Sequence, residues 1–247
     1  MVNFNSMSGH SKWKTIKHAK GVQDAKRGAI FSRVSKDIII ATQLGGGSDV
    51  KFNTYLRVAI EKAKAANMPT EKIDKAIAKG MGKAEGDSML EKTYEVNGFG
   101  GVIILIDCET DNSNRTVGEL KNIVNKLGAK LVPEGSLSWN FEELGKIVIE
   151  KKDNIDETLL SIISIDGVVD VENEDGVITI YTNRESLKSV LEQIKQSIEN
   201  YNFVEASLVK EAKDKIDISE EIYNKNEELI DQIKNHPDVV YVWDNIN

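Results

Sequence analysis

The sequence predicts an α+β protein in which an N-terminal helical domain precedes two ferredoxin-like α+β domains, one inserted into the other. Three observations lead to this prediction. Apolar residues recur at helical spacing up to residue 80, strand and helix patterns alternate after residue 100, and the segment 80–88 between them contains three glycines. With 247 residues, 40% of them hydrophobic, the chain can form several cores.

Three helices are expected in the N-terminal part. The first covers residues 22–44, where apolar side chains recur at spacings of three and four, and Gly45-Gly46-Gly47-Ser48 ends it. The second covers residues 51–67. The third begins after Pro69 and ends at Gly80, in the positions that proline and glycine favour around a helix.

Strand and helix patterns then alternate. The apolar run 102–108 predicts a buried strand, and a helix at 116–127 and a strand at 137–141 follow it. The order strand, helix, strand, strand, helix, strand comes next, which is the ferredoxin-like order, over residues 146–150, 156–165, 168–172, 177–182, 185–198 and 204–209. Glu174-Asp175-Gly176 predicts a hairpin turn between the two central strands.

The remaining elements are expected to complete a second unit of the same order. They are a strand near 215–218, a helix at 219–235 and a strand at 239–243. We therefore predict four segments along the chain. These are a helical, basic domain at 1–80, a Gly-rich linker at 81–89, a split ferredoxin-like domain at 90–144 plus 210–247, and an inserted ferredoxin-like domain at 145–209.

Charge is divided unequally between the two halves of the chain. Residues 1–86 contain 16 Lys and Arg against 7 Asp and Glu, a net of +9, whereas residues 87–247 have a net of −17. The overall charge of −8 by itself argues against a nucleic-acid partner, because phosphates are repelled by an acidic protein. It is, however, the average of an acidic part and a basic N-terminal segment, and the basic segment could bind phosphates. The alternative interpretation is that the basic and the acidic surfaces only contact solvent and bind no partner.

The basic character is strongest near the N-terminus. Residues 9–20 contain four lysines, two histidines and a tryptophan, and further cations follow. Lysines neutralise phosphates, arginines offer forked donors, and an aromatic ring can stack on an unpaired base, although Trp13 could equally anchor a core. The candidate nucleic-acid-binding residues here are His10, Lys12, Trp13, Lys14, Lys17, His18, Lys20, Lys26, Arg27 and Arg33.

Two further candidates lie between a predicted strand and helix. The segment 110–116 is rich in Asp, Asn and Ser, which favour turns and helix N-caps, so its small polar residues have a structural explanation. Arg115 is less easily explained in that way. We therefore add Asn114 and Arg115 to the candidate nucleic-acid-binding residues.

Signatures of other functions are missing from the sequence. No nucleophile motif, phosphate loop or metal-ligand spacing is present, so we expect no catalytic residues, no metal and no cofactor. The single cysteine, Cys108, fits a reducing compartment such as the cytoplasm, and no apolar run is long enough to enter a membrane as a helix. The oligomeric state is not defined by these residues; a monomer is favoured.

Several short motifs resemble the YebC/PmpR family in order and spacing from residue 7 to the end, more loosely beyond 145. They include Met7-Ser8-Gly9-His10-Ser11-Lys12-Trp13, Gln23-Asp24-Ala25-Lys26-Arg27-Gly28, Leu44-Gly45-Gly46-Gly47, Ala66-Asn67-Met68-Pro69, Gly100-Gly101-Val102 and Asn114-Arg115-Thr116. The resemblance implies a three-domain, cytoplasmic, non-enzymatic protein. Family members are described as probable DNA-binding transcriptional regulators. A mitochondrial relative is instead a translational activator, and bacterial relatives have been placed at the ribosome.

Three functions therefore remain open. The first is a DNA-binding transcriptional regulator that uses the basic N-terminal domain. The second, an alternative to this leading prediction, is a ribosome-associated translation factor that binds ribosomal RNA. It gains some weight because no helix carries an obvious set of Arg, Asn and Gln for reading the major groove. The third, a small-molecule sensor, depends only on what ferredoxin-like domains do elsewhere.

Overall fold

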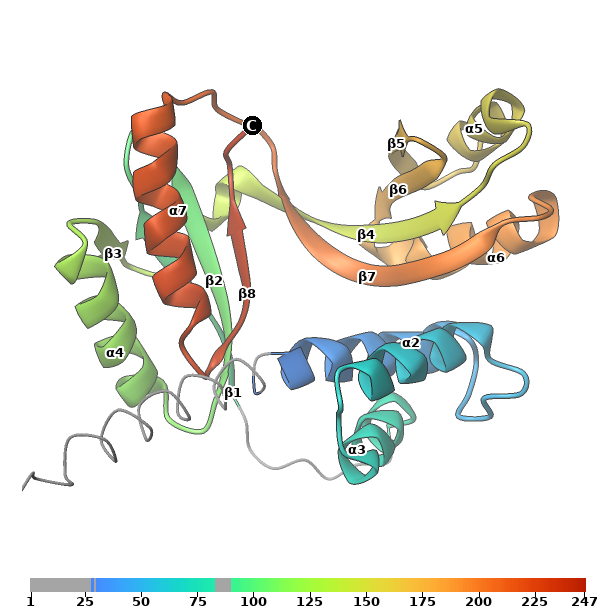
Figure 1. Ribbon diagram of the computed structural model, residues 1–247, viewed down its shortest axis with the longest axis horizontal. Helices are drawn as coiled ribbons and strands as arrows, with labels where there is room; N and C mark the ends of the chain where they lie inside the picture. Colours follow the sequence, from blue (N-terminus) through green and yellow to red (C-terminus); the bar gives the residue numbers. More distant parts are fainter. Residues whose placement is uncertain (1–27, 29, 83–89) are drawn as a thin grey trace, which may run out of the picture.

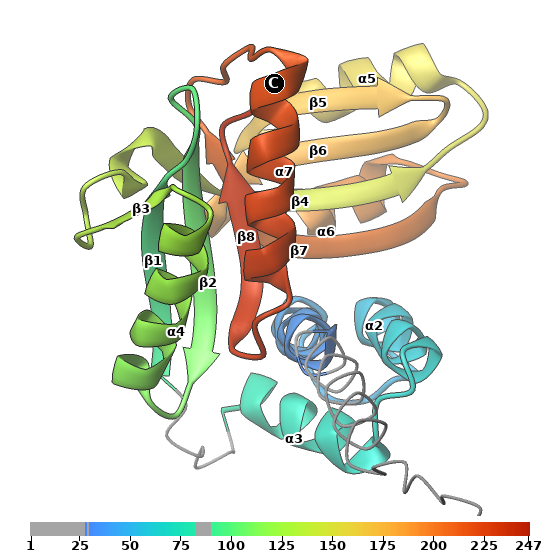
Figure 2. The same cartoon turned by 60° about the vertical axis from the view of Figure 1, so that its left-hand side comes forward.

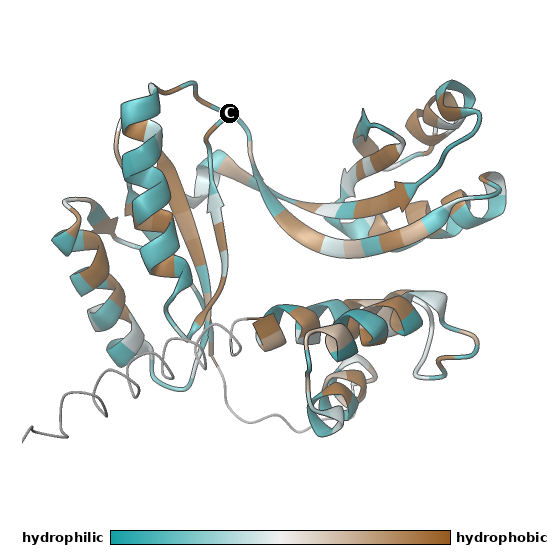
Figure 3. Ribbon diagram, in the orientation of Figure 1, coloured by the Kyte–Doolittle hydropathy of each residue, from teal (hydrophilic) through white to brown (hydrophobic). Residues whose placement is uncertain are grey.

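The computed structural model in Figure 1 describes residues 28, 30–82 and 90–247. A helical part is followed by two four-stranded antiparallel sheets, each of which carries two helices, so the predicted α+β fold class is confirmed. Figure 3 shows β2 and β4 as largely hydrophobic strands and α7 as a largely hydrophilic helix surface, as expected for sheets covered on one face by amphipathic helices.

The helical part consists of a helix over residues 30–44, α2 (Thr54–Ala65) and α3 (Thr70–Gly80). The first helix ends at residue 44, as the glycine run predicts, and the predicted residues 22–27 lie outside the described residues. The three helices share a core around the fully buried Ile38, Leu56 and Ala63. Asn53 caps α2, because its side chain accepts a hydrogen bond from the amide of Leu56 at 2.9 Å.

The first sheet has the strand order β3-β1-β2-β8, and all neighbouring strands are antiparallel. Its strands are β1 (Leu90–Asn97), β2 (Ile103–Thr110), β3 (Lys130–Val132) and β8 (Val239–Asp244). The helices α4 (Ser113–Lys126) and α7 (Glu220–Lys234) cover one face. Their apolar side chains meet those of the sheet in a core that includes Ile104, Ile106, Leu120 and Leu229.

Several details of this unit differ from the prediction. The chain enters through a hairpin, β1–β2, so the order of elements is β-β-α-β-α-β instead of β-α-β-β-α-β. The expected strand at 137–141 is a 3₁₀ turn, Ser138–Asn140, from which β4 starts at Phe141. The expected strand near 215–218 forms only a single bridge, between Ile216 and Ile246.

The second sheet has the order β5-β6-β4-β7, which is the predicted ferredoxin-like arrangement. Its elements are β4 (Phe141–Glu150), α5 (Ile155–Ile163), β5 (Val168–Glu174), β6 (Val177–Asn183), a 3₁₀ turn (Arg184–Ser186), α6 (Leu187–Ser197) and β7 (Asn202–Ala212). Asp175 and Gly176 have φ values of 50° and 84°, as the predicted hairpin turn requires. The long strands β4 and β7 pair from Phe141–Ala212 to Glu150–Asn202 and curve together (Figure 1).

The helical part contacts both sheets, and Figure 2 shows it below them in a second view. Against the second sheet, the ring of Tyr55 meets Phe203 edge to face at 4.8 Å, and Lys62 pairs with Glu205 at 3.1 Å. Against the first sheet, Arg33 donates a hydrogen bond to the carbonyl of Val240. The three parts therefore meet around one central region.

Candidate nucleic-acid interface

Nine of the twelve predicted site residues belong to the segment before residue 28. His10, Lys12, Trp13, Lys14, Lys17, His18, Lys20, Lys26 and Arg27 lie outside the described residues. The structure places Arg33 in the helix over residues 30–44, and Asn114 and Arg115 in the first turn of α4. The placed candidates thus belong to two different parts of the molecule.

Arg33 lies at the junction between the helical part and the first sheet. Besides donating from Nε to the Val240 carbonyl, its guanidinium lies 5.7 Å from the centre of the Tyr241 ring. Such a cation–π contact adds to the attraction between the two parts. Arg33 therefore stabilises the junction, a role that its position in a basic stretch did not indicate.

Arg115 is held by two carboxylates. Its Nη2 lies 2.9 Å from Asp111 and 3.0 Å from Asp238, and the hydrogen bond with Asp238 is the main reason that the pKa of Arg115 is raised. Burial raises the pKa of Asp238, but hydrogen bonds from Thr116, at 2.6 Å, and Arg115 outweigh it and lower that pKa. The guanidinium thus joins α4 to the start of β8, and the neighbouring Asn114 is exposed beside it.

Six other cations are exposed on the helical part, and we call them the outer cations. Three lie on α3 at spacings of three and four, so they form one stripe along that helix. Within residues 30–82 and 90–247, none of the six is in an ion pair with a carboxylate. The outer cations are Lys51, Arg57, Lys64, Lys72, Lys75 and Lys79.

Two lysines that face the sheets are, by contrast, paired with carboxylates. Lys36 lies 3.4 Å from Glu109 and 3.7 Å from Glu91, and Lys62 pairs with Glu205. Carboxylates of the sheets thus neutralise Lys36 and Lys62, whereas the outer cations remain exposed to solvent. The outer cations are not among the residues predicted from the sequence, although the spacing of Lys72, Lys75 and Lys79 indicates one charged face of a helix.

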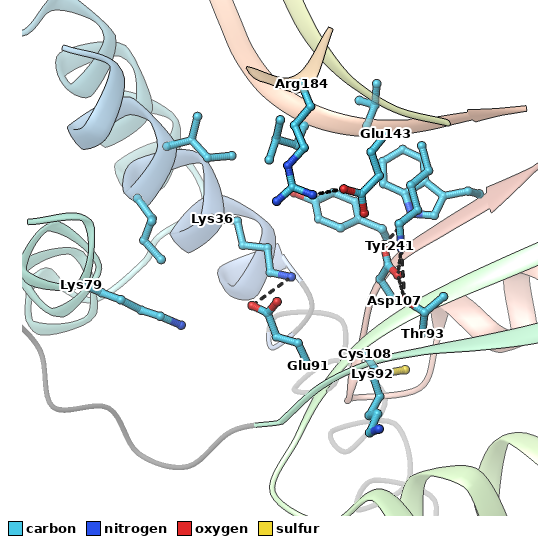
Figure 4. A pocket seen from close by; sticks show the side chains of 16 residues that line it. Lys36, Lys79, Glu91, Lys92, Thr93, Asp107, Cys108, Glu143, Arg184 and Tyr241 are labelled. Carbon is cyan, nitrogen blue, oxygen red and sulfur yellow. Dashed lines mark hydrogen bonds and ion pairs between the residues drawn. The ribbon is translucent and has the colours of Figure 1, made fainter. Parts of the chain in front are cut away.

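A cavity of about 370 Å³ lies where the three parts meet (Figure 4). Five cations and three carboxylates line it, and most of them are paired: Lys210 with Asp107 at 2.6 Å, Arg184 with Glu143, and Lys36 with Glu91. Asp107 also accepts hydrogen bonds from Thr93 and Trp243. The cavity is therefore a junction of ion pairs. Lys79, at the end of the α3 stripe, reaches toward it (Figure 4).

Three other features of the described residues bear on a reactive thiol, a metal site and a membrane-spanning helix. The thiol of Cys108 is buried, which raises its pKa to about 12 and keeps it protonated. Within the same residues, no group of three or more His, Cys, Asp or Glu side chains could hold a metal ion. Nor does any helix among them have the length and apolar character needed to cross a membrane.

The sequence matches family models over most of its length and is similar to proteins from several bacteria. Residues 11–83 match the model of the TACO1/YebC protein N-terminal domain, and residues 89–246 match that of the TACO1/YebC second and third domain. A probable transcriptional regulatory protein of Thermoanaerobacter pseudethanolicus is 43% identical over 241 residues, which are 97% of each chain. Another from Dictyoglomus turgidum is 40% identical over 98% of this chain and 96% of its own.

A solved structure is similar over most of its length. The crystal structure of a conserved hypothetical protein from Aquifex aeolicus superimposes with a TM-score of 0.68 at 34% sequence identity, and the match covers 91% of each chain. The three-part arrangement described above is therefore shared with an experimentally determined relative.

Proposed function

Because this chain belongs to the TACO1/YebC family, whose curated relatives are named probable transcriptional regulatory proteins, we propose that it is a non-enzymatic regulator of gene expression that binds nucleic acid through its basic N-terminal helical part. One observation carries the proposal. The outer cations are exposed and unpaired within the described residues, although the same molecule contains many carboxylates.

The physical argument concerns where phosphates could bind. A cation that already pairs with a carboxylate gains little from a phosphate, whereas an exposed unpaired lysine neutralises it and releases condensed counterions. The two sheet units carry the net negative charge, so the helical part would supply most of the contact with a phosphate backbone. The basic residues before residue 28 would extend the same contact along the chain.

We propose duplex DNA as the first partner, in keeping with the names of the relatives. The α3 stripe consists of lysines, which bind backbone phosphate and do not discriminate between bases as Arg, Asn and Gln do. This observation favours a second candidate, a translation factor that binds ribosomal RNA by its shape. In that case the protein should sediment with ribosomal particles at low salt.

The test measures affinity against salt concentration for labelled duplex DNA and a ribosomal RNA fragment. Replacing Lys72, Lys75 and Lys79 by Ala should weaken binding and reduce the slope of log K against log salt by roughly 2 to 3, at about 0.9 per lost phosphate contact on a duplex. The same change at Lys12, Lys17, Lys26 and Arg27 should act in the same direction.

A matched control removes three positive charges from the first sheet unit. Lys121, Lys126 and Lys130 are exposed and are not in an ion pair within the described residues, so their replacement by Ala changes the net charge equally. It should leave the slope within experimental error of the wild type. Absence of salt-dependent binding to both polymers, or equal slopes for the two triple variants, would show that the proposal is wrong.

A further inference from the structure

A second groove lies between α2 and the facing elements α6 and β7, away from the central cavity. Its volume is about 540 Å³. Four aromatic residues line it: Phe52, Tyr55, Tyr201 and Phe203. Aromatic residues are 6% of the chain, so this is a marked concentration of rings at one place. We call it the aromatic groove.

Phe52 is the most unusual of these residues because its side chain is 84% exposed. The loop that carries it is nevertheless well defined, since the next residue, Asn53, is buried and its side chain binds both ends of the loop. The side-chain Nδ2 of Asn53 donates to the carbonyls of Ala41 and Gly47, both at 2.9 Å, while its side-chain oxygen caps α2. The ring is thus presented to solvent by a preorganised loop.

Close packing in this loop excludes other residues at one position. A Cβ atom at Gly45 would lie 1.9 Å from the side chain of Asn53, so only glycine allows the clamp to form. Gly46 has a φ of 74°, which glycine adopts readily. The glycine run therefore ends a helix and also allows the loop conformation that carries Phe52.

The aromatic groove is lined by both rings and charged side chains. Tyr55 and Phe203 form the edge-to-face pair described above, and Tyr201 is half-buried beside them. Exposed cations stand on both rims, Arg57 on α2 and Lys188 and Lys195 on α6, together with Glu61 and Glu192. Lys51, which precedes Phe52 in the sequence, is also exposed.

We propose that the aromatic groove binds an unpaired segment of nucleic acid, with a base stacked on Phe52 and the adjoining phosphates near Arg57, Lys188 and Lys195. An exposed ring flanked by cations is the arrangement that single strands require, because every base has a face on which a ring can stack. In a duplex, those faces are covered by neighbouring base pairs. This inference rests on the proposed function and adds a contact with an unpaired segment to the phosphate contacts proposed for the helical part.

The test compares variants of the full chain in their affinity for short labelled single strands of RNA and DNA and for a duplex of the same sequence. Phe52→Leu keeps an apolar side chain but removes the ring, and should weaken single-strand binding by about 5- to 150-fold. Phe52→Tyr, which keeps the ring, should bind like the wild type. Trp139→Leu is the matched control, because Trp139 is an exposed aromatic outside the groove.

Two further results would support the assignment. Replacing Lys188 and Lys195 by Ala should reduce the salt slope for single strands by roughly 1.4, at about 0.7 per phosphate. Ultraviolet irradiation should crosslink a base to Phe52 or Tyr201, as located by mass spectrometry of the digested protein.

The outcomes separate this proposal from the one on which it rests. If the wild type binds duplex and single strands equally and Phe52→Leu changes neither, the helical part still binds nucleic acid but the groove assignment is wrong, and another occupant such as a peptide must be sought. If the wild type binds no nucleic acid, both proposals are wrong. A selective loss of single-strand binding in Phe52→Leu, with Trp139→Leu unchanged, supports the groove.

Discussion

Replacing Glu95 by Ala should be among the most destabilising changes in the first sheet unit. Glu95 is on β1, yet its side chain is only 1% exposed. One carboxylate oxygen accepts a hydrogen bond from the amide of Gly135 at 2.6 Å, and the other accepts from those of Leu137 and Ser138 at 2.5 and 3.3 Å. The carboxylate therefore fixes the connection between β3 and β4 across the sheet face opposite α4 and α7.

The expected loss follows from those bonds. A hydrogen bond to a charged group contributes about 1.5–3 kcal/mol net, so the two short bonds give a loss of roughly 3–6 kcal/mol in the free energy of unfolding. Glu95→Gln should cost at least half as much, because one of its two acceptors becomes an amide nitrogen that donates. Both variants should also be cut faster by protease between residues 133 and 140, where the backbone would no longer be tied to β1.

Urea unfolding followed by tryptophan fluorescence measures the effect. Trp139 lies in the affected connection and donates to the carbonyl of Ser136 at 2.9 Å, so it reports on this region. The control is Glu134→Ala, which removes an exposed carboxylate 3.9 Å from Lys92 in the same connection and should cost under about 0.5 kcal/mol. A Glu95→Ala protein within about 1 kcal/mol of the wild type would refute the reasoning.

Two other predictions concern titratable groups. Burial raises the pKa of Asp37 to about 6, with Lys62 opposing and Glu205 adding to the shift. Because the folded protein binds this proton more tightly than the unfolded chain, the contribution of Asp37 to stability falls as pH rises from about 4 to 6. Asp37→Asn should remove that dependence and gain about 2 kcal/mol at neutral pH. Urea midpoints of both proteins across this pH range test it, and parallel curves would contradict it. The buried thiol of Cys108, with a pKa of about 12, should resist iodoacetamide in the folded protein and react fully in guanidinium chloride. Rapid alkylation without denaturant would count against the burial of β2.

The sequence predicted the second sheet better than the first, and Glu95 shows why. Strands of the second sheet alternate or run apolar, as in Ile147 and Ile149 on β4, so their pattern identifies them. In β1, a buried glutamate stands between Tyr94 and Val96 and hides the alternation. Its burial depends on amides about 40 residues away, which local pattern cannot reveal. The hairpin entry was missed together with this strand.

The sequence predicted that the candidate site is basic and lies in the helical part, but it identified only some of the residues. The basic helical part follows directly from charge counting. Which cations are available depends on partners far along the chain, such as Glu109 for Lys36 and Val240 for Arg33. The exposure of Phe52 likewise depends on how Asn53 is buried. Sequence patterns within one helix or loop contain no information about these long-range partners.

The pairing of β4 with β7 has a consequence for how the chain folds. The amide of Lys213 donates to the carbonyl of Asn140 at 2.9 Å, so the two crossings between the sheets lie side by side. Bringing together the ends of a flexible segment as long as residues 140–213 costs roughly 4 kcal/mol in chain entropy. Contacts inside the second sheet offset that cost, and β8 can then join β2 as if the intervening residues were a short turn. We therefore expect β8 to pair with β2 about as fast as a strand that follows after a short loop, although many residues separate the two strands in the sequence.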